Sequence, residues 1–441
     1  MDVMEVCIAD VVFRDDLYPR AEHDPALVQK YAGHLSVLPP IEVNQNSELI
    51  DGKHRWLAHQ KQNRETLFAV ITETDNDGHL LELAIERNAT HGQQMTNRDK
   101  KRAACKIYAD TPISEAASKK KKLAELLSVD PKTINTWVSD IARQRKAERD
   151  GVICQQYLAC KTQEEIAEQI EVPRKTIRKV LALLAKLQIG PEPDDPEAPP
   201  DIGLSEEYWR RLASHSEPEF SPPLFDVWNW SKNANHKHYG NTHIGIVDNL
   251  LYTFTEPFDI VIDPFAGGGS TIDICKRRLR RYWVSDRNPI IERAGEIRKH
   301  DLTAGVSGPK HWGDVSLVYL DPPYWKQAAG QYSADPEDLA NMPFDQFTES
   351  LVGIIHGYAK KIKTGSYIAC IISPTQWPNE DKTTNYHDID LACRVGNGLK
   401  LVRRAVCPYS TEQYNGTQVE IAKERKLWMI LSRTLLVWEK Q

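Results

Sequence analysis

The C-terminal part of the chain alternates short apolar runs with amphipathic stretches. Ile260–Ile262 and Leu317–Leu320 are apolar at consecutive positions, so each predicts a strand buried on both faces, as in a parallel sheet. The same pattern predicts helices over 244–254, 271–280, 344–361 and 386–395, and strands over 281–286, 366–372, 399–407 and 427–439. This alternation predicts an α/β fold. It also leaves little chain for a further element after residue 324.

Two successive pairs of helices are predicted in the middle of the chain. In the first pair, Asp130 can cap the second helix and Pro131 suits its first turn. The outer face of that helix holds the hydrogen-bonding side chains that a reader of the DNA major groove needs: Lys132, Thr133 and Asn135.

The second pair begins with a capping box, Thr162 with Glu165, and turns at Val172-Pro173. Its second helix carries the outward residues Arg174, Lys175, Thr176 and Arg178. An ordinary helical hairpin is the alternative interpretation. Two tandem units with this turn chemistry favour helix-turn-helix DNA binding.

The N-terminal segment predicts strand, turn, strand and helix between Ile41 and Trp56. The helix follows Gly52 and opens with Lys53, His54 and Arg55. A glycine followed by basic residues at a helix start can hold a phosphate or nucleotide. A plain surface turn is the other interpretation.

Charge is segregated along the chain, whose net charge is −6. Between Asn97 and Ile189 there are 20 Lys and Arg against 12 Asp and Glu, which favours an anionic partner for the middle. Five prolines and four acids in Gly190–Pro200 predict an extended linker. The predicted domains are an α+β domain (1–95), an all-α region (96–189), the linker (190–201) and an α/β domain (202–441).

No apolar run approaches the roughly 18 residues of a membrane span, and the first ten residues hold no basic side chain. We therefore expect no membrane association and a cytoplasmic, DNA-associated protein.

A glycine-rich turn follows the strand that ends at Asp263. Gly267 and Gly269 allow the backbone to approach a ligand closely. The next predicted strand ends at Asp286, where a carboxylate can accept hydrogen bonds from two ribose hydroxyls. By itself this pattern also fits a dinucleotide-binding domain.

The more specific motif is Asp321-Pro322-Pro323-Tyr324, at the end of an apolar strand. The two prolines fix the backbone and remove two amide donors. The Asp321 carboxylate and the Pro322 carbonyl are then free to accept hydrogen bonds from one exocyclic amine, and Tyr324 offers a face for stacking. A base inside a duplex cannot reach such a site, so the base must be flipped out.

The C-terminal domain resembles the amino DNA methyltransferases that use S-adenosylmethionine, with a Rossmann-like sheet. Asp321–Tyr324 resembles their catalytic motif, Asp286 their ribose-binding acid and Asp301 the acid near the cofactor adenine. The glycine turn resembles their cofactor motif, which implies cofactor contacts for Asp263, Phe265, Ala266, Gly267, Gly269 and Ser270. The resemblance implies direct methyl transfer without a metal, to adenine N6 in preference to cytosine N4. We also expect Trp325–Met342 to form a loop over the flipped base.

The N-terminal domain resembles the ParB/sulfiredoxin-like family through Leu49–Arg55 and Glu86–Gly92. In that family the glycine turn can bind a nucleotide, often CTP. Here Gly52–Arg55 departs from the family pattern at its third position, so a scaffold or DNA-clamping role is the stronger expectation. The whole chain resembles phage and prophage proteins that fuse such a domain to a methylase. Double-stranded DNA is the implied partner, and a homodimer remains open.

Other functions are compatible with the sequence. The protein could be a ParB-like DNA-binding regulator with a vestigial methylase domain, or it could methylate RNA or a protein glutamine. His387-Asp388-Ile389-Asp390 could be a metal cluster, but it is better interpreted as a polar helix start.

Overall fold

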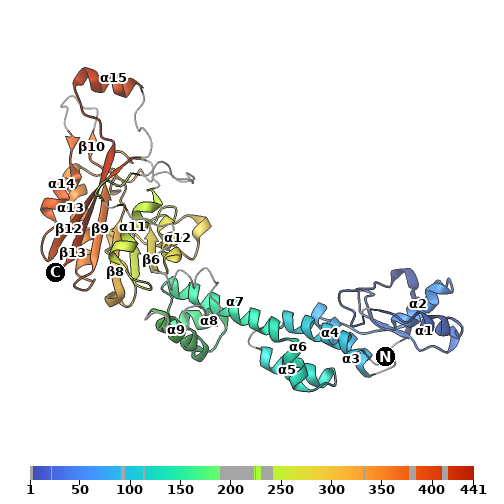
Figure 1. Ribbon diagram of the computed structural model, residues 1–441. Coiled ribbons are helices and arrows are strands. Elements are labelled where there is room, and N and C mark those ends of the chain that lie inside the picture. Colours follow the sequence, from blue (N-terminus) through green and yellow to red (C-terminus); the bar gives the residue numbers. More distant parts are fainter. Residues whose placement is uncertain are drawn as a thin grey trace. The chain divides into compact units, whose positions relative to one another are not determined.

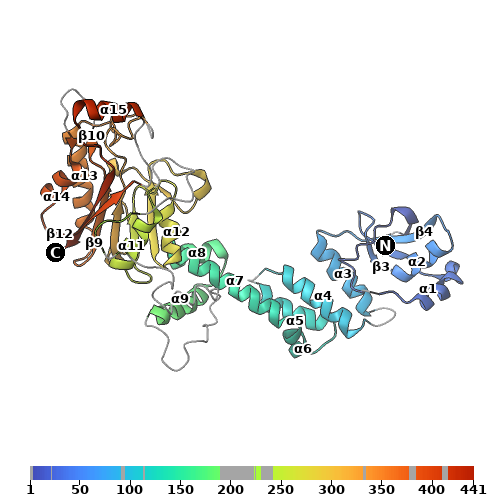
Figure 2. The same ribbon diagram turned by 45° about the horizontal axis from the view of Figure 1, so that its top comes forward.

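The computed structural model describes residues 3–20, 22–90, 95–112, 115–188, 223, 225–229, 242–330, 334–376, 384–409 and 416–441. These residues belong to two compact units, Met1–Arg149 and Asp150–Gln441 (Figures 1 and 2). The predicted linker Gly190–Pro200 lies outside the described residues. Short 3₁₀ helices among the described residues are Ile8–Asp10, Leu35–Val37, Ile291–Arg293, Leu302–Ala304 and Trp312–Asp314.

The first unit begins with a four-stranded sheet in the order β1-β4-β2-β3. Its strands are β1 (Val3–Cys7), β2 (Ile41–Val43), β3 (Leu49–Asp51) and β4 (Thr66–Ile71). The β2 and β4 strands are parallel, whereas β1 and β3 pair antiparallel to their neighbours. Three helices accompany the sheet: α1 (Pro25–Ala32), α2 (Lys53–Lys61) and α3 (Asp77–Thr90). The predicted order of strand, turn, strand and helix between residues 41 and 56 is confirmed.

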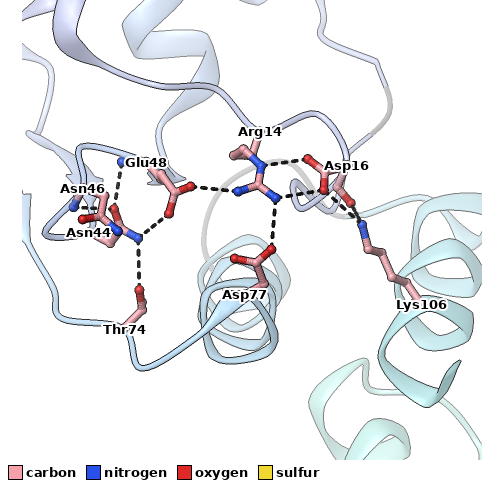
Figure 3. Close-up of polar contacts among 8 residues, drawn as sticks. All are labelled: Arg14, Asp16, Asn44, Asn46, Glu48, Thr74, Asp77 and Lys106. Atoms are coloured by element: carbon pink, nitrogen blue, oxygen red, sulfur yellow. Dashed lines mark hydrogen bonds and ion pairs between the residues drawn. The ribbon is translucent and has the colours of Figure 1, made fainter. Parts of the chain in front are cut away.

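Arg14 joins separate segments of this unit (Figure 3). Its guanidinium group donates hydrogen bonds to Asp16, Glu48 and Asp77, each at 3.0 Å. The hydrogen bond from Arg14 lowers the pKa of Asp16. Lys106, on the fourth helix, also pairs with Asp16, at 3.7 Å. This cluster fixes the loop after β1 to the β2–β3 turn and to two helices.

Four helices follow: α4 (Asn97–Asp110), α5 (Ala116–Leu126), α6 (Pro131–Trp137) and α7 (Ser139–Leu158). The Asp130 carboxylate accepts a hydrogen bond from the Lys132 amide at 2.7 Å and so caps α6, as predicted. Leu123, Leu127 and Ile134 are buried between the helices of this pair. The first predicted helix pair is therefore present.

The boundary between the two units falls within α7, after Arg149. The second helix pair, α8 (Gln163–Ile170) and α9 (Arg174–Gln188), belongs to the C-terminal unit. Ile166 and Ile177 are buried in the same hydrophobic core as Val261 of the large sheet. The sequence predicts both helix pairs within one region (96–189), whereas packing assigns them to different units. The predicted capping box is confirmed, because Thr162 and Glu165 exchange two hydrogen bonds.

A seven-stranded sheet forms the centre of the C-terminal unit, in the order β12-β13-β9-β8-β5-β6-β7. The strands are β5 (Ile260–Asp263), β6 (Arg281–Asp286), β7 (Arg298–Lys299), β8 (Val315–Leu320), β9 (Tyr367–Ile372), β12 (Leu399–Pro408) and β13 (Ser432–Lys440). The strands from β9 to β7 are parallel, and β13 runs antiparallel to both of its neighbours. The fold is a Rossmann-like α/β sheet, as predicted.

Helices cover both faces of this sheet (Figure 2). Val261 packs on one side with α11 (Ile244–Phe254) and α12 (Ser270–Arg277). Ile260 and Ile262 pack on the other side with α13 (Phe344–Ala359) and α14 (His387–Arg394). Neighbouring residues of β5 thus enter different cores, which explains why the strand is apolar throughout.

The expectation of little spare chain after residue 324 is wrong. A hairpin of β10 (Thr375–Gln376) and β11 (Thr384–Asn385) follows β9, and α15 (Gly416–Arg425) lies between β12 and β13. The last strand also begins at Ser432 rather than at residue 427. Because β12 is parallel to β9, it ends at the edge of the sheet where β8 and β9 end, and α15 follows there (Figure 1).

Candidate active site

Three acidic residues end adjacent parallel strands of the large sheet. Asp263 is the last residue of β5, Asp286 the last of β6, and Asp321 directly follows β8. The chain order reverses between β5 and β8, since β6 and β7 continue on one side and β9 on the other. Ligands of open α/β sheets bind at the carboxyl ends of the strands at such a reversal point. The topology therefore brings the predicted site residues to the place where a ligand is expected.

The turn after β5 has the backbone that its glycines predict. Gly267 and Gly269 have φ angles of +49° and +80°, values that L residues rarely adopt. Gly269 caps α12, and a side chain there would approach Arg293 and Ile272. The half-buried Phe265 and the buried Ala266 form the first part of the turn, and Ser270 opens α12.

Asp286 lies directly against the glycine turn. Its two carboxylate oxygens accept hydrogen bonds from the Gly267 amide, at 3.0 Å, and the Asn288 amide, at 2.8 Å. Each carboxylate oxygen retains a lone pair for a further donor. This position is suited to accept the hydroxyls of a ribose that lies across the turn.

Asp301 lies near the same edge but already has several partners. Its carboxylate accepts from the Thr303 amide and hydroxyl, at 3.0 and 2.9 Å, and pairs with Arg287 at 2.9 Å. The hydrogen bond from the Thr303 amide lowers the pKa of Asp301. Arg287 also pairs with Asp335, at 2.6 Å. The segment expected to cover the base is thus tied to the side of the sheet where Asp286 lies.

Asp321 is the centre of a hydroxyl network. Thr242 donates to its Oδ2 atom at 2.5 Å, and Tyr319 donates to the same atom at 3.3 Å. Tyr324 donates to Oδ1 at 3.2 Å. The predicted acceptor therefore holds three hydroxyl donors, and an incoming amine must share or displace them. Pro322 is buried and Pro323 half-buried, so both lie within the fold beside this carboxylate.

Arg433 adds a buried positive charge to this network. Its side chain is 7% exposed and donates to the Thr242 hydroxyl at 2.9 Å. Burial raises the pKa of Asp321, while the hydrogen bond from Thr242 and the charge of Arg433 lower it. Burial alone would lower the pKa of Arg433, but Tyr324 and Asp321 raise it overall. The arginine thus favours the ionised form of Asp321.

Asp263 is buried beneath the glycine turn. Its carboxylate accepts from the Phe265 amide at 2.9 Å and from the Thr271 hydroxyl at 2.6 Å. Burial nevertheless raises the pKa of Asp263 to about 7. The two hydrogen bonds hold the start of the turn in place.

The residues predicted to contact DNA lie on two separate helices. Lys132 and Asn135 of α6 are exposed, and Thr133 is half-buried. On α9, Arg174, Lys175 and Arg178 are exposed and Thr176 is half-buried, and Arg174 pairs with Glu164. These side chains remain candidates for contacts with an anionic partner.

The residues of the predicted phosphate turn already have partners within the first unit. Gly52 has a φ of +103° and caps α2, while Lys53 is buried with its ammonium 4.3 Å from the ring centroid of Phe13. His54 accepts from the Asp24 amide at 2.9 Å. Arg55 pairs with Asp51 at 2.6 Å and donates to two proline carbonyls. Nucleotide binding at this turn stays a prediction and would require these contacts to change.

His387 and Asp388 open α14, as expected for a polar helix start. The His387 ring lies 3.1 Å from the Thr375 hydroxyl, and Asp388 accepts from Thr434. Burial lowers the pKa of His387 to about 4. Across the part of the chain that the structure describes, no group of three His, Cys, Asp or Glu side chains is placed to hold a metal. None of the described helices is both long and apolar enough to cross a membrane.

Sequence reasoning missed the residues that surround Asp321. Tyr319 precedes it by two positions and could have been found, because alternate residues of a strand share one face. Thr242 and Arg433 lie 79 and more positions away along the chain, and no local pattern marks them. Only the fold brings them to the site.

Comparison with known proteins places this site in context. No protein-family model matches the chain. A stretch of 76 residues, 17% of the chain, is 37% identical to "Putative methylase YubD" of Escherichia coli (strain K12) and spans only 34% of that protein. The chain is therefore similar to a methylase over about a third of that protein's length.

Two solved structures show a distant similarity to this chain. A SAM-dependent methyltransferase from Geobacter sulfurreducens, in complex with S-adenosyl-L-homocysteine, is 12% identical, covering 45% of this chain and 90% of its own, with a TM-score of 0.29. The C-terminally truncated ParB of Caulobacter crescentus, complexed with CTP-γ-S, is 18% identical, covering 32% and 79%, with a TM-score of 0.19. Both TM-scores are below 0.5, and neither match assigns a function to this chain.

Proposed function

We propose that the protein is an S-adenosylmethionine-dependent DNA methyltransferase that modifies the exocyclic amine of a flipped base, with adenine N6 as the expected target. The single observation that carries this proposal is the position of Asp321–Tyr324. This motif follows β8 at the reversal point of the sheet, beside the glycine turn that follows β5.

The residues of the glycine turn fit the proposed cofactor. Gly267 and Gly269 leave the backbone open to close approach, and Asp286 has acceptor capacity for ribose hydroxyls. Asp301 would lie on the adenine side. S-adenosylmethionine would supply an electrophilic methyl group at this edge of the sheet.

The chain's own residues would position the target amine. The Asp321 carboxylate and the Pro322 carbonyl would accept hydrogen bonds from the two N–H groups of this amine. The nitrogen lone pair would then point toward the methyl group. Tyr324 would lie against the base. Most of the rate would then come from positioning. The segment Trp325–Met342 would cover the base, and the hydrogen bond from the Trp325 indole to the Met342 carbonyl, at 2.7 Å, joins its two ends.

We further propose that α5–α6 and α8–α9 act as helix-turn-helix units that hold the duplex. Their second helices carry the exposed Lys132, Asn135, Arg174, Lys175 and Arg178. Such side chains contact phosphates and base edges.

The test is methyl transfer from labelled S-adenosylmethionine to unmethylated plasmid DNA, followed by digestion and identification of the nucleoside. Asp321→Asn preserves the size of the side chain and should lower the rate about 100-fold or more without loss of cofactor binding. Asp314→Asn is the matched control, because Asp314 lies just before β8, at the opposite end of the strand. Its rate should remain close to wild type.

The nucleoside decides between the alternatives. N6-methyladenine that disappears in Asp321→Asn supports the proposal. N4-methylcytosine would preserve the mechanism and overturn the target base. Cofactor binding without any transfer to the plasmid would overturn the proposed DNA methyltransferase activity, and so would label acquired only in parallel reactions with RNA or a peptide.

A further inference from the structure

A basic cavity lies among α4, α5, α6 and α7 of the first unit. Its volume is about 510 Å³, and none of the described residues that line it is acidic. Five of them are cationic: Lys120, Lys121, Arg145, Lys146 and Arg149. A concave surface lined by side chains of one charge sign raises the local concentration of ions of the opposite sign, here anions.

Part of this cavity is held in a defined arrangement. Tyr108 is buried, and its ring lies 5.2 Å from the Lys120 ammonium and 5.6 Å from the Arg145 guanidinium. Arg145 also donates to the Tyr108 carbonyl at 2.6 Å and to the Thr111 carbonyl. Two of the cations are therefore positioned by the fold on the cavity wall.

A second cavity of the same unit shows that the basic lining is a local feature. That cavity, of about 550 Å³, is lined by both lysines and carboxylates, and Lys119 pairs there with Glu82. The four consecutive lysines Lys119–Lys122 therefore have different surroundings. Lys120 and Lys121 line the basic cavity, while Lys122 lines neither of the two.

We propose that the basic cavity binds a phosphate group and that its ligand is a phosphodiester of the DNA backbone. This inference rests on the proposed DNA substrate. Asn135, which we propose as a groove-facing residue of α6, lines the same cavity. A DNA strand that α6 contacts would therefore pass the opening of this cavity. The α5 helix begins there at Ala116, and its positive dipole end adds to the charge of the five cations.

The experiment measures the affinity of the full chain for duplex DNA between 50 and 200 mM salt. Lys121→Gln removes a charge from the cavity, and Lys122→Gln removes one from the next position of the same helix. Both lysines are exposed, so the folded state should tolerate both changes, as the midpoint of thermal unfolding will verify. Each phosphate contact contributes about 0.9 to the slope of log affinity against log salt. Lys121→Gln should reduce this slope by about 0.9, which corresponds to a roughly 3-fold smaller loss of affinity over that range, and Lys122→Gln should leave it unchanged.

Equal slopes for the two variants would overturn the phosphate site. A calorimetric titration with pyrophosphate in the absence of DNA separates the two sources of phosphate. Pyrophosphate binding that is lost in Lys121→Gln, together with an unchanged DNA slope, would overturn the assignment to the backbone in favour of a free polyphosphate. Failure of the proposed function has a different signature, because the wild-type chain would then transfer no methyl group to DNA, whereas the salt slopes of the two variants depend only on DNA binding.

Discussion

Arg433 connects a buried charge to the proposed catalytic carboxylate through one hydroxyl, that of Thr242. The ionised carboxylate of Asp321 accepts hydrogen bonds from an amine more strongly than the protonated acid does. Burial raises its pKa, and Arg433 opposes that effect. We predict that Arg433→Gln shifts the acid limb of the kcat/KM profile to higher pH, whereas Arg433→Lys preserves the charge and shifts it less. The profile measured from pH 5 to 9 is the test.

The two substitutions separate charge from geometry. If Arg433→Gln and Arg433→Lys lowered activity equally at every pH, Arg433 would act only through packing and hydrogen bonding. Such a result would contradict its proposed influence on the ionisation of Asp321.

Asp263 makes the stability of the C-terminal unit depend on pH. Its pKa is raised from 3.8 to about 7 in the folded chain, so the folded state binds a proton more tightly than the unfolded state. Stability should therefore fall as the pH rises from about 4 to 7 and remain low above that range. Asp263→Asn should remove this dependence on pH. At pH 8 it should raise the free energy of unfolding by up to about 4 kcal/mol. The test is the midpoint of thermal unfolding of the unliganded protein at pH 5 and at pH 8. If the difference between these two midpoints were the same in Asp263→Asn as in wild type, the prediction would be refuted.

At the scale of elements, the capping box at the start of α8 gives a clear test. The Thr162 hydroxyl accepts from the Glu165 amide, and the Glu165 carboxylate accepts from the Thr162 amide. Thr162→Ala should destabilise the C-terminal unit by about 1 kcal/mol, because α8 contributes Ile166 to its core. Thr162→Ser retains the cap and should remain close to wild type in chemical denaturation. Equal losses in both variants would show that the cap does not stabilise this unit.

Helices and strands that bury one face were predicted from the sequence, whereas α15, which buries almost none of its surface, was not. The predicted strand over 281–286 matches β6, and the predicted helix over 244–254 matches α11. The helix predicted over 271–280 ends at Arg277, because Leu279 adopts a φ of +56°. By contrast, α15 buries only Ala422, so it lacks the apolar period from which a helix is recognised.

At the scale of the whole molecule, the unit boundary changes the design of truncations. Removal of residues 1–149 should leave a folded C-terminal unit, since that unit begins at Asp150. Removal of residues 1–190 also deletes Ile153, Ile166 and Ile177 from the core shared with the sheet. For the chain without residues 1–149, we predict that the C-terminal unit unfolds at a midpoint near that of the same unit in the full chain. For the chain without residues 1–190, we predict a clearly lower midpoint. Comparable midpoints would show that the second helix pair is not part of this core.

The same comparison separates the two regions that we propose to bind DNA. The first truncation retains α8–α9 and should bind labelled S-adenosylmethionine with wild-type affinity. Its affinity for duplex DNA should fall, because α6 and the basic cavity are removed. If this truncated chain bound duplex DNA as tightly as the full chain, DNA binding would be assigned to the C-terminal unit alone.

Local sequence patterns predicted most of the strands and helices of the large sheet, and they identified the residues at the strand ends that we propose as the site. Consecutive apolar residues, glycines at left-handed positions and the Asp-Pro-Pro-Tyr motif are local features, so Asp263, Gly267, Asp286 and Asp321 could be named without a structure. Tertiary structure alone decided which distant residues join them. Thr242 and Arg433 reach Asp321 because α11 packs against β8 and β13 lies one strand beyond β8, next to β9. Lys121 differs from Lys122 because Lys121 lines the basic cavity and Lys122 lines neither of the two cavities described above. Such neighbours depend on packing between elements far apart in the chain, which local patterns do not encode.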